Sequence, residues 1–374
     1  MSEIIEKNNG NHHFNWFKRG FFAREIIEKT NGNPFGTHRV IEPKGVLPQP
    51  ALKVCNDMDS IYDNEILVDV ETLNIDSASF TQIKKACDND EEKIKAMIMQ
   101  IVGERGKMQN PVTGSGGMFR GKVIKIGSKL KGKIKLQEGD KIASLVSLSL
   151  TPLKIEKIIG IKPGTEQVNV QAKAIIFESG IYAKLPEDMP ETLALAVLDV
   201  AGAPAQTAKL VRPGDTVVIM GAAGKSGVLC SYEARRRAGV GGKIIGITSS
   251  DRGLAAMKDY GFCHECLKLS ATDAVACYEK IKEVTGGKMA DVVINCVNIP
   301  NTEMASILMT RDRGTVYFFT MATSFTKAAL GAEGCGRDVD MIIGNGYCKD
   351  HAEVTLNILR ESEKIRKIYQ EKYA

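Results

Sequence analysis

The sequence predicts an α/β protein of two domains, an antiparallel β-barrel followed by a doubly wound parallel sheet. Its 374 residues are enough for two domains. Short apolar runs broken by Gly and Pro fill residues 30–195, which is typical of antiparallel β structure. From residue 196, strand-like runs alternate with helical segments. A glycine-rich loop, GAAGKSG, follows the first of these later strands.

The first domain is expected over residues 1–195. Its apolar runs include EILVDVETLNI, GKVIKIG, KIASLVSLSL and KAIIF, separated by turn residues. A charged segment at 81–104 has helical composition and is predicted as an insert. The first 30 residues are polar and are expected to form an N-terminal extension.

The second domain is expected over residues 196–346, and the charged amphipathic stretch at its end predicts one C-terminal helix within 347–374. TVVIM at 216–220 is a continuous apolar run, as expected for a strand buried on both faces. A helix is predicted over 224–238. Later strands are predicted at 243–247, 264–269, 291–297, 314–319 and 338–347.

The loop at 221–227 is predicted to hold the phosphates of a dinucleotide. Its GKS resembles the end of an ATP-binding loop, but that motif requires a glycine where this chain has Ile219. The spacing instead suits a Rossmann-type turn. There, Gly221 allows a tight turn, Gly224 allows close approach of a pyrophosphate, and Gly227 allows the helix to pack on the sheet. The new helix offers free N–H groups.

The end of the second parallel strand bears on the choice between NAD and NADP. A carboxylate there binds the adenosine ribose, and this chain has Thr248 at that position. Ser249, Ser250 and Arg252 would accommodate a 2′-phosphate, so the sequence tolerates NADP and does not exclude NAD. Asp251 is expected to cap the next helix.

Further cofactor contacts are expected where other strands end, because the carboxyl ends of parallel strands share one edge of the sheet. The complete predicted set is Gly221, Ala222, Ala223, Gly224, Lys225, Ser226, Gly227, Thr248, Ser249, Ser250, Arg252, Cys296, Val297, Asn298, Thr320, Met321, Ala322 and Asn345.

Composition argues against several other classes of protein. The net charge of +5 is spread along the chain, so no nucleic-acid partner is expected. No apolar run approaches the roughly 20 residues of a membrane helix, and no secretion signal opens the chain. Nine scattered cysteines favour reduced thiols in the cytoplasm. Cys263 and Cys266 form the only CxxC, which alone does not predict a zinc site.

Several ordered segments resemble the medium-chain dehydrogenase/reductase family. They are RGKVIKIG at 120–127, EGDKIAS at 138–144 and LVRPGDTVVIMGAAGKSG at 210–227. The resemblance implies a GroES-like antiparallel β-barrel beside the Rossmann-type sheet, a nicotinamide cofactor, and a homodimer or homotetramer. The positions at which zinc-dependent relatives keep metal ligands hold Asn74, Gly117 and Met118, so no metal is expected.

Three other stretches are similar to the L-erythro-3,5-diaminohexanoate dehydrogenases of anaerobic lysine fermentation. They lie at 35–54, 114–123 and 198–217, largely outside the glycine motif. This similarity implies NAD as cofactor and oxidative deamination of the 3-amino group, which would yield 5-amino-3-oxohexanoate and ammonia. The alternatives are a zinc-free quinone or enoyl reductase of the same family, or a nucleotide-binding protein without chemistry.

An amine substrate of this kind needs a general base, because an ammonium group cannot lose hydride before it loses a proton. Asp76 and Asp199 are the predicted catalytic carboxylates; a helix cap and a structural hydrogen bond, respectively, are their alternative roles. Arg120 and Glu178 are predicted to bind the charged ends of the diamino acid, although Glu178 also suits a solvent-facing strand position. His38 and Arg39 could also meet the substrate carboxylate.

Overall fold

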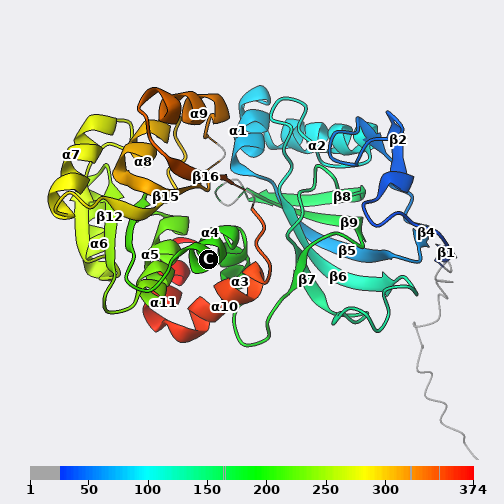
Figure 1. Cartoon of the computed structure of the whole chain (residues 1–374). Coiled ribbons are helices and arrows are strands. Elements are labelled where there is room, and N and C mark those ends of the chain that lie inside the picture. The colour runs from blue at the N-terminus through cyan, green and yellow to red at the C-terminus, as the bar shows by residue number, and fades with distance from the viewer. Residues whose placement is uncertain (1–25, 163, 165, 321, 345) are drawn as a thin grey trace, which may run out of the picture. The chain divides into compact units, whose positions relative to one another are not determined.

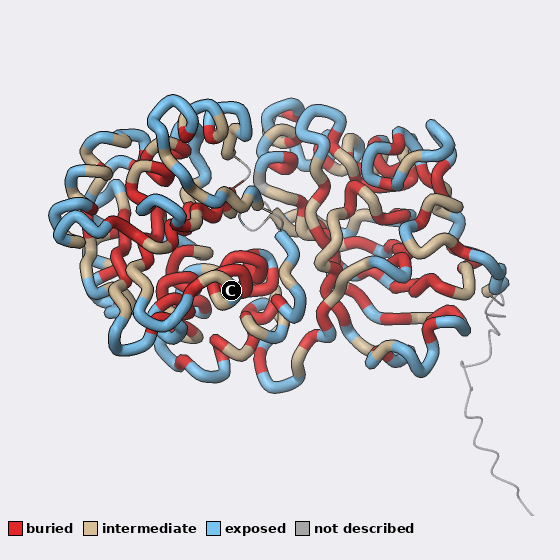
Figure 2. Tube along the Cα trace, in the orientation of Figure 1, coloured by how far each residue is buried: buried red, intermediate tan, exposed pale blue. Residues whose placement is uncertain are grey.

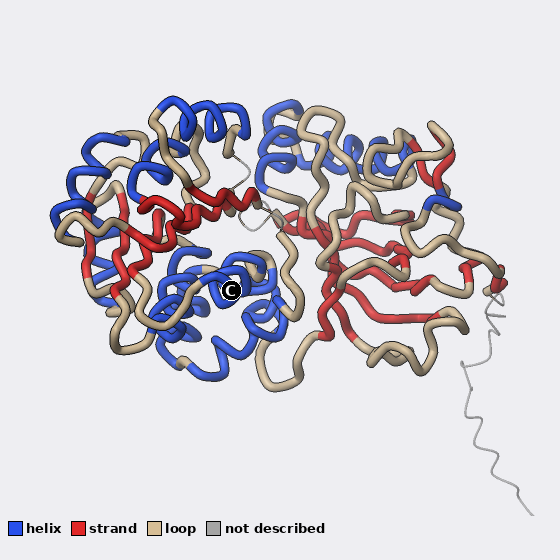
Figure 3. The backbone as a smooth tube through the Cα atoms, viewed as in Figure 1, coloured by secondary structure: helices blue, strands red, loops and turns tan. Residues whose placement is uncertain are grey.

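The structure, a computed structural model, describes residues 26–162, 164, 166–320, 322–344 and 346–374. The chain forms two compact units that divide between Ile181 and Tyr182. The division lies earlier than the expected boundary at 195 because α3 (Glu191–Leu198) packs on the C-terminal helices of the second unit. Figure 3 shows the strand-rich first unit and the alternating helices and strands of the second.

The first unit is built on a six-stranded sheet with the order β10-β7-β6-β5-β9-β8. At its centre, β5 (Glu65–Asn74) runs antiparallel to β6 (Met118–Ile126) and to β9 (Gln167–Phe177). The sheet is completed by β7 (Lys141–Ser144), β8 (Leu153–Lys162) and β10 (Tyr182–Lys184), which begins the second unit. Most side chains of β5 are buried, as expected for a central strand.

Short elements complete the first unit. β1 (Ile27–Lys29) pairs with β4 (Ser60–Tyr62), and β2 (Val40–Glu42), preceded by the 3₁₀ turn Thr37–Arg39, pairs with β3 (Lys53–Val54).

The predicted helical insert consists of two helices, α1 (Ser77–Ala86) and α2 (Glu91–Arg105). The break is local, because Asp88 and Asn89 adopt left-handed φ values of 53° and 60°. Asp90 then caps α2 by accepting a hydrogen bond from the Lys93 amide.

The second unit contains a six-stranded parallel sheet with the order β13-β12-β11-β14-β15-β16 (Figure 1). Its strands are β11 (Thr216–Met220), β12 (Lys243–Thr248), β13 (Glu265–Lys268), β14 (Ala290–Asn295), β15 (Thr310–Phe318) and β16 (Val339–Ile343). The chain reverses its direction of travel across the sheet between β11 and β14, which is the switch point of a Rossmann-type fold. The predicted doubly wound sheet is confirmed.

Helices cover both faces of this sheet (Figure 1), and its central strands are accordingly buried (Figure 2). α4 (Gly202–Leu210), α5 (Lys225–Ala238) and α6 (Asp251–Tyr260) supply one face, and α7 (Ala274–Val284), α8 (Glu303–Met309) and α9 (Phe325–Gly334) supply the other. β11 shows how this arises from its sequence. Val217 and Ile219 pack in the first layer, while Val218 and Met220 pack in the second.

The C-terminal stretch forms two helices, α10 (His351–Glu361) and α11 (Glu363–Lys372), and the prediction of a single helix is wrong. Ser362 is extended, with φ −122° and ψ 99°, and its side chain accepts a hydrogen bond from the Ile365 amide at 3.2 Å. The serine therefore caps a second helix instead of continuing the first. No helix within the described ranges has the length and apolarity to cross a membrane.

Candidate active site

The glycine-rich loop has the geometry that a dinucleotide pyrophosphate requires. β11 ends at Met220, and Gly221 turns with φ 77°, a conformation that suits glycine. A Cβ on Gly227 would lie 2.1 Å from the Gly221 carbonyl oxygen. Only a glycine at 227 therefore lets α5 start so close to the strand.

The start of α5 is open to an anion. Gly224 occupies the N-cap, where no side chain satisfies the first amides of the helix. The nearest atom to a Cβ on Gly224 would be the Gly221 carbonyl oxygen at 3.3 Å. Free N–H groups at a helix N-terminus bind phosphate, so these residues fit a nicotinamide dinucleotide.

The switch point brings the loop after β14 beside this turn. A Cβ on Gly221 would lie 3.2 Å from Val297 Cγ2. The Asn295 side chain shapes this loop by accepting a hydrogen bond from the Val297 amide at 3.0 Å. The Cys296 and Cys230 sulfurs are 3.9 Å apart, and their hydrogen bond together with burial raises the pKa of the Cys296 thiol well above its ordinary value. Cys296 therefore stays protonated and does not suit a nucleophilic role.

The predicted cofactor segments after β14 and β15 are in contact. The Thr320 hydroxyl bonds to Asn298 Oδ1 at 3.1 Å and accepts a hydrogen bond from the Ala322 amide at 3.1 Å. The loops after β14 and β15 are thus joined at the carboxyl edge of the sheet. Met321 and Asn345 lie outside the described residues.

The end of β12 differs from expectation in one detail. Ser250, not Asp251, caps α6, because its hydroxyl accepts a hydrogen bond from the Gly253 amide at 3.0 Å. Asp251 is the first residue of the helix and pairs with Lys268 at 2.7 Å. The strand ends at the half-buried Thr248 and not at a carboxylate, and Ser249 and Arg252 beyond it are exposed.

Asp199 and Lys225 form an ion pair that joins the α3–α4 junction to the glycine loop. Lys225 Nζ lies 2.6 Å from Asp199 Oδ2. The α11 residue Tyr369, which is fully buried, donates its hydroxyl to the Lys225 carbonyl oxygen at 2.5 Å. Burial raises the pKa of Tyr369 well above its ordinary value, so the hydroxyl keeps its proton.

The two carboxylate oxygens of Asp76 have different surroundings. It caps α1, since its Oδ1 accepts a hydrogen bond from the Ser79 amide at 3.0 Å. Its Oδ2 is buried and has no hydrogen-bond partner among the described residues. A cap needs only one carboxylate oxygen, so the cap does not use the second.

Arg120 lies on β6, beside the end of β5 that precedes Asp76. It pairs in register with Thr72, bonds to the Thr72 hydroxyl at 3.0 Å, and lies 3.7 Å from the Glu71 carboxylate. It lines a polar groove of about 640 Å³ that also contains Glu156 and Lys162.

Glu178 is not brought near these residues. It follows β9, whose last residue, Phe177, pairs with Glu65 at the far end of β5 from Asp76. The ten residues of β5 separate the two ends by about 30 Å. Glu178 instead accepts a hydrogen bond from Asn64 at 3.0 Å and lies 3.6 Å from Lys129.

His38 and Arg39 also serve the fold. His38 Nε2 lies 2.7 Å from the Glu65 carboxylate, and Arg39 bonds to both of its oxygens at 2.7 and 2.6 Å. Arg39 and Glu65 are buried. The geometry therefore does not support a contact of His38 and Arg39 with a substrate carboxylate.

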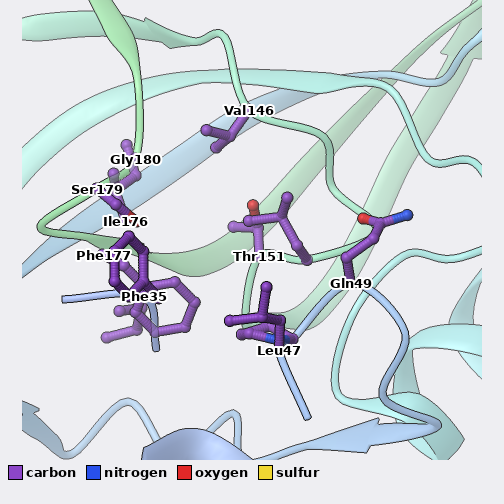
Figure 4. Close-up of a pocket in the computed structure, with 12 residues that line it drawn as sticks. Phe35, Leu47, Gln49, Val146, Thr151, Ile176, Phe177, Ser179 and Gly180 are labelled. Carbon is purple, nitrogen blue, oxygen red and sulfur yellow. The ribbon is translucent and has the colours of Figure 1, made fainter. Parts of the chain in front are cut away.

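The Glu178 end of the sheet carries an apolar pocket of about 180 Å³ (Figure 4). Phe35, Leu47 and Ile176 are among the side chains that line it. None of the predicted site residues lines this pocket, and its apolar wall does not suit a substrate with three charged groups.

Over the described ranges, no group of three or more His, Cys, Asp or Glu side chains is placed to hold a metal ion. In the CxxC, Cys263 contacts a serine hydroxyl. Cys263 Sγ contacts the Ser231 hydroxyl at 3.7 Å, and burial raises the pKa of its thiol to about 12.

Sequence reasoning missed two features of this site. The Asp199–Lys225 ion pair and the Tyr369 contact join residues 26 and 144 positions apart. Neither spacing has a sequence signature. The amphipathic pattern around Tyr369 predicts a helix and gives no indication of this contact.

The sequence of the chain matches two protein families and two curated relatives. Residues 38–186 match the family described as L-erythro-3,5-diaminohexanoate dehydrogenase N-terminal domain, and residues 227–333 match the family described as zinc-binding dehydrogenase. L-erythro-3,5-diaminohexanoate dehydrogenase of Acetoanaerobium sticklandii is 62% identical over 91% of this chain and 99% of its own length. The protein of the same name from Fusobacterium nucleatum is 59% identical over the same shares.

Solved structures share the fold at low identity. A mycobacterial quinone oxidoreductase is 18% identical, with a TM-score of 0.51 over 90% of this chain and 88% of that one. A mycobacterial protein complexed with NADPH is also 18% identical, with a TM-score of 0.51 over 93% and 88%. These structures support the two-domain fold alone. With its near-full-length identity to two curated relatives of one name, the chain belongs to the L-erythro-3,5-diaminohexanoate dehydrogenase family.

Proposed function

We propose that this protein catalyses the nicotinamide-dependent oxidative deamination of L-erythro-3,5-diaminohexanoate to 5-amino-3-oxohexanoate and ammonia. The observation that carries the proposal is the identity of 62% and 59% to proteins of that name over 91% of the chain. Such identity extends through both units, so it includes the barrel residues as well as the cofactor loop.

The proposed cofactor is NAD, as the family resemblance implies. Its pyrophosphate would bind at Gly221, Gly224 and the uncapped amides of α5, and its nicotinamide would supply the hydride acceptor. Thr248 and the exposed Ser249 and Arg252 leave room for the 2′-phosphate of NADP. Parallel assays with the two cofactors decide the preference.

Asp76 is the proposed general base. The free carboxylate oxygen would take a proton from the substrate 3-ammonium group, which lets the nitrogen lone pair assist loss of hydride from C3. The same carboxylate could then guide addition of water and departure of ammonia. Arg120 is the proposed cation for the substrate carboxylate.

Assembly and location complete the proposal. A homodimer or homotetramer in the cytoplasm, without a nucleic-acid or membrane partner, agrees with the family resemblance. The nine cysteines are all free thiols, which fits a reducing compartment.

The test is turnover of purified protein with L-erythro-3,5-diaminohexanoate, followed by absorbance of the reduced nicotinamide, with NAD and NADP in parallel and a chelator present. Reduction with the diamine is expected. No reduction with either cofactor, together with oxidation of NADPH by a quinone or an enone, would reject the amine assignment.

A further inference from the structure

We propose that Lys225 exchanges partners when the cofactor binds: its ammonium leaves Asp199 for the pyrophosphate, and the released carboxylate binds an ammonium group of the substrate. The first half concerns the cofactor alone. The second half rests on the proposed diamine substrate.

The main chain of Lys225 is fixed while its side chain can change partner. Lys225 is the first residue of α5 and directly follows the uncapped Gly224. Tyr369 holds the Lys225 carbonyl oxygen at 2.5 Å from a fully buried position. The Lys225 side chain is 29% exposed, and a four-carbon stem with several rotatable bonds carries its ammonium.

The present partner of this ammonium is replaceable. Asp199 lies at the carboxyl end of α3, its side chain is 42% exposed, and among the described residues it bonds to Lys225 at 2.6 Å. Exposed ion pairs of this kind contribute little to stability. A pyrophosphate at the start of α5 would place two negative charges beside the same ammonium, and charge-assisted bonds to phosphate are strong.

Exchange leaves Asp199 with an unneutralised carboxylate near the bound phosphates. A cation then restores the balance of charge, and the proposed substrate carries two ammonium groups. Cofactor binding therefore raises the affinity for the diamine, and by reciprocity the diamine raises the affinity for the cofactor. The expected kinetic order has the cofactor binding first.

A simpler role for Asp199 makes the opposite prediction. If the carboxylate only orients Lys225 toward the phosphates, removing its charge weakens cofactor binding. If it competes with the phosphates for the ammonium, removing its charge strengthens cofactor binding. Asp199→Asn keeps the size of the side chain and removes only the charge.

The experiment titrates the full chain with NADH, without substrate, and follows nicotinamide fluorescence. Lys225→Met is expected to raise the Kd about tenfold, the value of one charge-assisted hydrogen bond. Asp199→Asn is expected to lower the Kd several-fold, and the double variant should match Lys225→Met. Lys280→Met is the matched control, because it removes an ion pair of 2.8 Å with Glu283 on α7, and its Kd should equal that of the wild type.

A higher Kd for NADH in Asp199→Asn, or an unchanged Kd in Lys225→Met, overturns the proposed exchange of partners by Lys225. Thermal unfolding of each variant shows that the fold is kept. For the second half, Asp199→Asn should raise the KM for the diamine about tenfold with a small effect on kcat. A lower kcat at unchanged KM overturns the substrate contact. The NADH titration contains no diamine, so its result tests the exchange of partners by Lys225 even if the protein oxidises another substrate.

Discussion

The two oxygens of the Asp76 carboxylate differ in their surroundings, and we propose a chemical role for only one of them. Oδ1 holds the first turn of α1, and Oδ2 is buried without a described partner. A buried, unpaired carboxylate oxygen costs free energy, and a role in proton transfer would explain why it is retained.

Asp76→Asn separates the two roles. The amide oxygen can still accept the Ser79 hydrogen bond, so stability should change little, but the side chain can no longer take a proton. We expect kcat for the diamine to fall about 10²- to 10⁴-fold with the Kd for NADH unchanged. Asp90→Asn, which alters the equivalent cap of α2, serves as the control and should keep full turnover. Near-normal turnover in Asp76→Asn removes it as the base.

Glu65 contributes stability that depends on pH. Burial alone raises the pKa of its carboxyl, but hydrogen bonds from His38 and Arg39 outweigh burial and hold the pKa below the ordinary value of 4.5. The folded state therefore binds fewer protons than the unfolded state near this pH. The contribution is complete above the unfolded pKa and is lost as the pH falls through the folded pKa.

Glu65→Gln leaves Arg39 buried without its counter-charge. We expect it to lower the free energy of unfolding at pH 7 by about 3–5 kcal/mol, the usual cost of breaking a buried ion pair. Urea unfolding between pH 7 and pH 3 measures the effect, and the gap to the wild type should narrow at the acid end. Equal stability of the two proteins at pH 7 would contradict the buried ion pair.

At the scale of elements, the turn from β11 to α5 can be tested at two neighbouring glycines. A Cβ on Gly227 would lie 2.1 Å from a backbone oxygen, whereas the nearest atom to a Cβ on Gly224 would be 3.3 Å away. Gly227→Ala must therefore displace the helix from the strand, while Gly224→Ala needs only a small adjustment of the loop.

We expect Gly227→Ala to weaken NADH binding at least tenfold and to lower the melting temperature, since backbone clashes of this kind cannot be relieved by a rotamer change. Gly224→Ala should lose affinity with little loss of stability, because its site faces the phosphates. The two measurements are nicotinamide fluorescence and thermal unfolding. Equal melting temperatures for both variants would show that the close packing at Gly227 is not needed.

The elements that sequence predicted best are those with a local cause. β11 was recognisable because four apolar residues in a row, Val217 to Met220, suit a strand covered on both faces, and the structure buries all four completely. The helix break at Ser362 was missed because the amphipathic pattern continues through it. Only the serine, three residues before Ile365, marked a new N-cap.

At the scale of the whole molecule, the alternation of strands and helices predicts a doubly wound parallel sheet, and the observed strand order places the glycine loop at its switch point. The position of the glycine loop in the fold could therefore be predicted from sequence, while its role in cofactor binding and the role of Asp76 stay predictions. Glu178 could not be placed correctly, because the antiparallel register of β5 and β9 decides which end of the sheet it occupies. The contact between Tyr369 and Lys225 is a tertiary contact without a local signal.

The central claim is that this chain removes an amino group by oxidation. The most direct measurement is the ratio of ammonia released to nicotinamide reduced when purified protein consumes L-erythro-3,5-diaminohexanoate. Oxidative deamination requires one ammonia for each reduced nicotinamide. Reduction without ammonia, or ammonia without reduction, would contradict the account.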